Sequence, residues 1–379
     1  MSPLSSPLRR VAAAAAGVAV AVTLAPVAAA APVAPGAPLR VSPADPSLPG
    51  IPADIDTFAC SQGVSGEVRR QDGTTGPVML TAAHCVNSLY PDMPFAAEVK
   101  VPKQSGDQVI GTRGASGGPM AEDPAISSVD HTIELFTSPD WAIVDLDPAV
   151  PVSRLSESID YHGNPSGDGV AMTGVRDYRN VPGGQVRVDN FGHPICKDGM
   201  VSGRSCGVQL ARTQHAVFSW GLSYASGDSG GNNFDPNTGE VIGVTSQGVG
   251  PFGRTQTADA ALQDAYGIPD GEVNDHFTLP ESAAPHDTDF RTLGQDGAQA
   301  RGWLERNGYT AADATAPGEQ GTQEPAAPAS VQQHTDQLLE HVQSGDVDAA
   351  LDTARQAVDT ALGDAQAQWA DTLPTPLHF

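Results

Sequence analysis

The stretch Gly227-Asp228-Ser229-Gly230-Gly231 is the most informative part of this 379-residue sequence. Glycine has no Cβ, so a serine flanked by glycines can sit on a very tight turn of the backbone. Such a turn exposes the Ser229 hydroxyl and lets the N–H groups of Gly227 and Ser229 point at one bound anion. An ordinary glycine-rich turn is the alternative, so other parts of the sequence must supply what a reactive serine needs.

A serine hydroxyl becomes a strong nucleophile when an imidazole accepts its proton and a carboxylate holds that imidazole in the right tautomer. His84 stands near the end of Leu80-Thr81-Ala82-Ala83-His84-Cys85, where an apolar strand runs into small residues. Asp140 directly precedes the apolar run 141–144, at the mouth of a strand. Other aspartates lie nearby, but only Asp140 has an uninterrupted apolar strand after it. We therefore expect Ser229, His84 and Asp140 to form a catalytic triad.

The pattern of residue types over 56–268 predicts an all-β domain. Short runs of Val, Ile, Leu and Thr alternate there with Gly, Asn, Asp and Pro, as in antiparallel hairpins. Residues 258–266 form a helical pattern that ends at Gly267. The strands expected most clearly are 77–83, 141–146, 169–173, 185–188, 216–220 and 241–245.

The charge and the histidine pattern exclude several classes of function. A formal net charge of −25 argues against binding to nucleic acid and to anionic membrane surfaces. The ten histidines are scattered, with no His-Glu-x-x-His or comparable spacing, so a metal-dependent enzyme is a weak alternative. We expect no metal site and no cofactor.

The N-terminus predicts export. Arg9 and Arg10 precede an Ala/Val-rich run from Val11 to Leu24, and small residues of an Ala-x-Ala type follow. We expect a signal peptide over 1–31 and a secreted protein; a membrane anchor is the alternative. Residues 32–55 are rich in Pro and Ala and are interpreted as an unstructured lead-in or short pro-segment.

The region after residue 268 carries no catalytic motif. Residues 269–330 are expected to form an acidic, Pro/Ala-rich extension and linker, with a short helix at 299–307. Residues 331–372 predict a helical hairpin, because apolar residues recur at helical spacing on both sides of Ser344-Gly345-Asp346. A protein partner is the expectation for such a hairpin.

The order His84, Asp140, Ser229 along the chain resembles that of the chymotrypsin family. The segment Cys60-Ser61-Gln62-Gly63 resembles the first disulfide bridge of that family, and the segment from Cys196 to Cys206 resembles the small disulfide loop of its bacterial branch, the streptogrisins and α-lytic protease. This resemblance covers about 56–268. It implies two antiparallel six-stranded β-barrels with the triad in the cleft between them, followed here by the helical hairpin.

The resemblance also implies a disulfide pattern and a substrate site. Of the three possible connectivities, it favours Cys60 with Cys85 and Cys196 with Cys206. The strand containing Ser246, Gln247 and Gly248 would pair with the substrate backbone, and Ser246 would also bond Asp140. Ser223 would form the floor of the primary specificity pocket. An uncharged floor predicts a preference for uncharged side chains, although Arg254 stands close enough in sequence to alter it.

Asp228 requires a cation, because a buried unpaired carboxylate is costly. The bacterial branch has an arginine just after the first cysteine of the small disulfide loop, and this chain has Lys197 there. We expect a Lys197–Asp228 ion pair. The rival is cleavage after Arg40, which would free Val41 as the partner, although Ser42-Pro43 makes this unattractive.

Together these features predict a secreted serine endopeptidase that acts on polypeptides. Its oxyanion hole would be formed by the backbone N–H groups of Gly227 and Ser229. The alternative is a catalytically inactive family member that serves as a binding protein.

Overall fold

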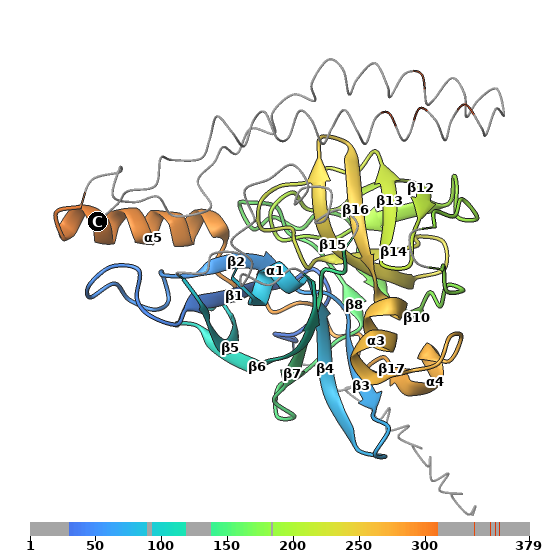
Figure 1. The fold of residues 1–379 in the computed structure, drawn as a ribbon. Helices are drawn as coiled ribbons and strands as arrows, with labels where there is room; N and C mark the ends of the chain where they lie inside the picture. Colours follow the sequence, from blue (N-terminus) through green and yellow to red (C-terminus); the bar gives the residue numbers. More distant parts are fainter. Residues whose placement is uncertain are drawn as a thin grey trace, which may run out of the picture.

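The computed structural model describes residues 30–88, 93–118, 138–182 and 185–309, and four isolated helical positions at 337, 349, 353 and 356. Two large antiparallel sheets dominate this part, with few helices around them (Figure 1). Residues 1–29 of the expected signal peptide lie outside the described residues. The expected hairpin over 331–372 also lies outside them, apart from the four isolated positions.

The C-terminal sheet closes on itself as a barrel. Its strands follow the order β15-β14-β11-β12-β13-β16, and β16 pairs back with β15, which completes a ring of six antiparallel strands. The short strand β10 adds to β15 in parallel. The strands are β10 (Gly174–Val175), β11 (Pro194–Lys197), β12 (Ser205–Arg212), β13 (Ala216–Trp220), β14 (Asn232–Phe234), β15 (Glu240–Val249) and β16 (Phe252–Thr257).

The N-terminal sheet has eight strands in the order β17-β3-β4-β7-β6-β5-β1-β2. Among the described residues its two edge strands do not pair, so it differs from the closed six-stranded barrel that was expected. Its strands are β1 (Pro38–Pro43), β2 (Phe58–Ser61), β3 (Ser65–Arg69), β4 (Thr75–Thr81), β5 (Phe95–Val101), β6 (Gln108–Gly117), β7 (Trp141–Leu146) and β17 (Phe277–Thr278).

The remaining elements are short, apart from one surface helix. The predicted helix is confirmed as α3, and Gly267 ends it in the left-handed conformation with φ 66°. The last helix starts before the predicted 299, because Thr292 and Gln295 form a capping box. These elements are β8 (Leu155–Ser156), β9 (Val170–Ala171), α1 (Ala83–Val86), α3 (Ala258–Tyr266), α4 (Val273–His276) and α5 (Leu293–Arg306).

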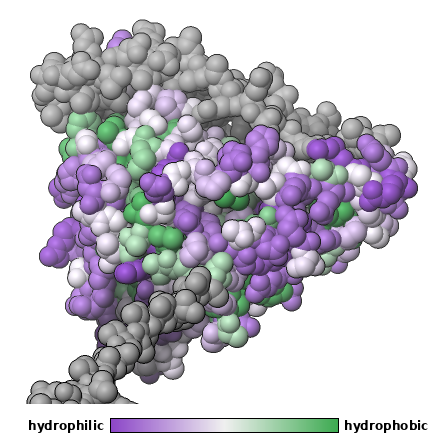
Figure 2. Space-filling view, turned by 180° about the vertical axis from the view of Figure 1, so that it is seen from behind, coloured by the Kyte–Doolittle hydropathy of each residue, from purple (hydrophilic) through white to green (hydrophobic). Residues whose placement is uncertain are grey.

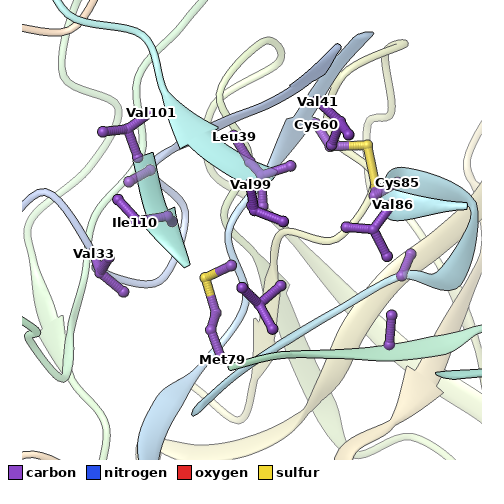
Figure 3. Packing of buried hydrophobic residues seen from close by; sticks show 14 of the residues in the cluster. Val33, Leu39, Val41, Cys60, Met79, Cys85, Val86, Val99, Val101 and Ile110 are labelled. Atoms are coloured by element: carbon purple, nitrogen blue, oxygen red, sulfur yellow. A yellow bond between two sulfur atoms is a disulfide. The ribbon is translucent and has the colours of Figure 1, made fainter. Parts of the chain in front are cut away.

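The expected lead-in over 32–55 is in part a structural strand. β1 pairs with both β2 and β5, so it lies inside the N-terminal sheet. Leu39 and Val41 are fully buried in the core, where Figure 3 shows them near Val99 and the Cys60–Cys85 bond. The N-terminal boundary at residue 56 is therefore corrected toward the N-terminus.

The boundary at residue 268 also moves, because the chain beyond it completes the same core. β17 pairs with β3, and Phe277 packs among core residues. Phe290 packs into the other side of the N-terminal sheet, against the cluster that contains Leu39. Residues 269–296 are thus part of the folded unit rather than an irregular extension, since their sparse apolar side chains are buried.

Few large apolar side chains are exposed among the described residues. Figure 2 shows hydrophilic residues spread over the face opposite that of Figure 1, with apolar residues interspersed. No helix among the described residues is long and apolar enough to cross a membrane.

Candidate active site

His84 and Asp140 meet between the two sheets. His84 lies on α1, directly after β4, and Asp140 immediately precedes β7, the strand that pairs with β4. The Nδ1 atom of His84 lies 2.9 Å from Oδ2 of Asp140, and the backbone N–H of His84 donates to Oδ1 over 3.2 Å. The carboxylate therefore fixes both the ring and the backbone of His84. This pairing leaves Nε2 of the ring as the nitrogen that can accept a proton.

Asp140 is further held by the C-terminal barrel. The hydroxyl of Ser246 donates to its Oδ2 over 2.5 Å, and the side-chain oxygen of Gln256 accepts the Asp140 N–H over 2.7 Å. The guanidinium of Arg254 donates to the Ser246 hydroxyl over 2.5 Å and to the Ser138 carbonyl. Arg254, considered from sequence as a neighbour of the specificity pocket, is thus directed toward Asp140.

Three ionisable groups in this cluster influence one another. Burial lowers the pKa of His84, but the charge and hydrogen bond of Asp140 outweigh burial, so the pKa is raised overall; Arg254 opposes this rise. Burial raises the pKa of Asp140, yet His84, Arg254 and Ser246 hold it below its ordinary value. Burial lowers the pKa of Arg254 to about 10, against the attraction of Asp140. At neutral pH Asp140 is a carboxylate that favours a proton on His84.

Ser229 lies on a loop that packs against the His84 segment. The N–H of Ser61, next to Cys60, donates to the Ser229 carbonyl over 2.8 Å. A Cβ added to Gly230 would lie 2.2 Å from Oγ1 of Thr81 and 3.4 Å from Sγ of Cys85, so only glycine permits this approach. No hydrogen bond joins Ser229 to His84 among the described residues; such contacts are often long without substrate.

Gly227 adopts a backbone conformation that favours glycine. Its φ is 103°, and its carbonyl accepts the hydroxyl hydrogen of Ser61 over 2.8 Å. Within the part of the chain that the structure describes, the N–H groups of Gly227 and Ser229 donate to no other residue. Two backbone donors two residues apart are therefore available at this turn.

Asp228 is buried between these two residues and has a buried cation. The Nζ of Lys197 lies 2.7 Å from its Oδ2, and both side chains are almost completely buried. The N–H groups of Val201 and Ser202 each donate to Oδ1 over 3.0 Å, and that of Ala225 donates to Oδ2 over 3.0 Å. The carboxylate thereby ties the Ser229 loop to β11 and to the small disulfide loop.

The alternative partner for Asp228 is placed elsewhere. Val41 lies in the interior of β1, paired with Phe58 and Val99, and Arg40 before it is fully buried. A cut after Arg40 would require this strand to leave the sheet, while Asp228 already has its cation.

The four cysteines form two disulfides with the expected partners. One joins Cys60 to Cys85, next to His84, and the other joins Cys196 to Cys206 across β11 and β12. Among the described residues, one group of side chains lies close enough to share a metal ion, namely Cys60, His84 and Cys85. Both sulfurs are engaged in the disulfide, so this donor set does not fit a metal.

The expected substrate-binding residues fall on two facing segments. Ser246, Gln247 and Gly248 lie on β15, whereas Ser223 lies on the segment that leads to Ser229. The Ser223 N–H donates to Oγ of Ser205 over 3.0 Å.

The sequence did not reveal Tyr224, and it indicated Arg254 as a neighbour of the specificity pocket rather than of Asp140. Tyr224 contacts Gly248, and Arg254 contacts Ser246. Both placements depend on the register of β15 against β16, for which the sequence contains no local signal.

A closed antiparallel barrel packs beside a second antiparallel sheet, with His84 and Asp140 at their junction. The fold is chymotrypsin-like. Similar solved structures include the Nocardiopsis protease, at 18% identity over 62% of this chain and 96% of that one, with a TM-score of 0.38. Another is Thermobifida fusca protease A, at 16% identity over 66% and 100%, with a TM-score of 0.37. No family model and no curated protein matches this chain.

Proposed function

We propose that this protein is a serine endopeptidase in which Ser229 is the nucleophile, His84 the general base and Asp140 the orienting carboxylate. The observation that carries the proposal is the pair of hydrogen bonds that the Asp140 carboxylate accepts from the ring and the backbone N–H of His84, beside the Ser229 loop. It leaves Nε2 of His84 to accept the hydroxyl proton of Ser229 as Ser229 attacks a carbonyl carbon. His84 then returns this proton to the leaving amine, while Asp140 stabilises the imidazolium.

The oxyanion of the tetrahedral intermediate would bind the N–H groups of Gly227 and Ser229. Their lack of partners among the described residues supports this role, because a donor already engaged could not stabilise developing charge. The hydrogen bond from Ser61 to the Gly227 carbonyl and the Lys197–Asp228 pair hold the loop in place beforehand.

The substrate would be an extended polypeptide that pairs with β15 at Ser246, Gln247 and Gly248. Two disulfides support secretion, because such bonds persist in oxidising compartments. A protein partner of the expected helical hairpin remains part of this proposal.

Covalent labelling with a fluorophosphonate probe tests the proposal. We expect the purified protein to be labelled and Ser229→Ala to lose labelling, with peptidase activity at least roughly 10⁴-fold lower. Ser226→Ala is the matched control, since Ser226 is an exposed serine of the same loop, and it keeps labelling. An unlabelled wild-type protein would instead favour an inactive family member that binds other proteins.

A further inference from the structure

The ring of Tyr224 lies against a pair of glycines on neighbouring strands. Gly248 of β15 and Gly253 of β16 are direct cross-strand partners. A Cβ added to Gly248 would lie 2.2 Å from Cγ of Tyr224, and one added to Gly253 would lie 1.7 Å from its hydroxyl oxygen. The ring therefore extends along both glycines, from one strand to the next. It leaves no room for a methyl group on either glycine.

Several contacts hold the ring there. The Tyr224 hydroxyl lies 3.3 Å from Oγ of Ser219, and the ring packs against a buried apolar cluster that includes Leu222 and Ile242. The Nζ of Lys197, which pairs with Asp228, lies 5.6 Å from the ring centroid. A side chain with a hydrogen bond, apolar packing and a neighbouring cation is costly to displace.

Tyr224 thus fills the space between the two segments that face a substrate. In the proposed function, the substrate pairs with β15 through Gly248, and its carbonyl reaches Ser229. If Ser223 forms the floor of the primary specificity pocket as expected, the side chain of the attacked residue would enter between β15 and the 223–225 segment, where the Tyr224 ring lies against Gly248 and Gly253. Among the described residues, two buried cations near this space are already engaged, Lys197 with Asp228 and Arg254 with Ser246 and Ser138, so neither offers its charge to an acidic side chain.

We propose that Tyr224 determines specificity by closing this space, so that the enzyme cleaves after glycine and alanine and rejects large side chains. This inference rests on the proposed function and adds its substrate class. In this proposal the uncharged Ser223 disfavours charged side chains, whereas the ring of Tyr224 sets the limit on size.

Peptide nitroanilides that differ only in the residue before the cleaved bond test the inference with the full chain. The wild-type protein should have a kcat/KM for alanine at least about tenfold above those for leucine and phenylalanine. Tyr224→Ala should raise phenylalanine relative to alanine by at least about tenfold, because it opens the space. Tyr224→Phe, which keeps the ring, should retain the wild-type order. If Tyr224→Ala does not fold, Tyr224→Leu takes its place as the test, because it keeps apolar packing. The Tyr224→Leu protein should favour leucine before the cleaved bond.

Fluorophosphonate labelling of each protein separates this inference from the proposed function. A labelled wild type that prefers phenylalanine or leucine would overturn the role of Tyr224 and leave the catalytic proposal standing. Labelled, folded Tyr224→Ala and Tyr224→Leu proteins with the wild-type order would do the same. A folded wild type that is not labelled would overturn the proposed function, and the specificity inference with it.

Discussion

Two buried groups of ion pairs differ in the length of chain that they join. Lys197 and Asp228 are 31 residues apart, and both belong to the C-terminal half of the described chain. Arg40 and Asp296 are 256 residues apart and join β1 to α5. The second group continues from Asp296 to Arg291. The first pair fixes the loop of the proposed nucleophile, whereas the second fixes the limits of the folded unit.

Burial alone does not reveal what an ion pair does. The Lys197 pair lies directly beneath Ser229, so losing it should affect both catalysis and stability. The Arg40 group joins β1 to α5, and none of its hydrogen bonds among the described residues reaches Ser229 or His84, so losing it should lower stability more than the activity of a folded molecule. Variants can test this division.

Deleting the chain after Ile268, which removes Arg291 and Asp296 of the second group, should have the largest effect on stability. A chain ending at Ile268 loses Val273, Phe277 and Phe290, whose burial is worth about 1.5–3 kcal/mol each. It also leaves Arg40 without Asp296. We expect this chain not to fold, since domains are stable by only about 5–15 kcal/mol. Circular dichroism and thermal unfolding measure this.

The control for this truncation is a chain ending at Tyr309, which keeps every contact of α5 described above. It should show a cooperative unfolding transition. A cooperatively folded chain ending at Ile268 would contradict the assignment of residues 269–296 to the core.

Breaking the first group should destabilise the protein and abolish activity together. Lys197→Ala leaves the buried Asp228 carboxylate without its cation, at a cost of about 3–5 kcal/mol. Urea unfolding and peptidase assays measure the two effects. Lys197→Arg retains the cation and should recover most of the activity. Full activity in Lys197→Ala would show that the pair does not position the Ser229 loop.

Removing only Asp296 from the second group should lower stability and leave activity nearly unchanged. Asp296→Ala removes the carboxylate that pairs with the fully buried Arg40. The loss should lower the free energy of unfolding by about 3 kcal/mol. We expect kcat/KM of the folded protein to stay within about twofold of the wild-type value. Glu305→Ala, an exposed change on the same helix, should alter stability by less than about 0.5 kcal/mol. A large loss of kcat/KM in folded Asp296→Ala would refute the division.

Substituting a third buried cation, Arg254, should have the smallest effect, a change in the pH dependence of kcat/KM. A base must be neutral, so kcat/KM should fall in acid as His84 gains a proton, at a pH set by its raised pKa. Arg254 opposes that rise. Arg254→Gln should therefore raise the pKa of His84 further and move the acid limb to higher pH. The exposed Arg179→Gln should leave it in place. A shift to lower pH would show that Arg254 does not act on His84.

Local patterns predicted the parts of the fold whose cause is local. The bounds of β7 and β13 agree with the predicted 141–146 and 216–220, because apolar residues there begin and end abruptly. The predicted strand at 185–188 is wrong among the described residues, which show one isolated bridge, from Arg187 to Arg212. Alternation of residue types alone does not provide a partner strand.

Distant contacts explain what the sequence did not reveal. Pro38-Leu39-Arg40-Val41-Ser42-Pro43 has two prolines and an arginine, so it resembles a linker. It becomes a strand because β2 and β5 flank it and Asp296 neutralises Arg40. The proposed chemistry rests on the local motif around Ser229, whereas the ring of Tyr224 reaches Gly248 only through the register of two later strands.

The bridge between Ala31 and His286 has a consequence for biosynthesis. Ala31 donates to the Pro285 carbonyl and accepts from the Asp287 N–H, each over 3.0 Å. At roughly 5–20 residues per second, a ribosome needs on the order of 10–50 s to pass from Arg40 to Asp296. During that time the first strand of the nascent chain lacks its last partners. We therefore expect β1 to be open to proteolysis in chains arrested before Asp296, and protected once translation is complete.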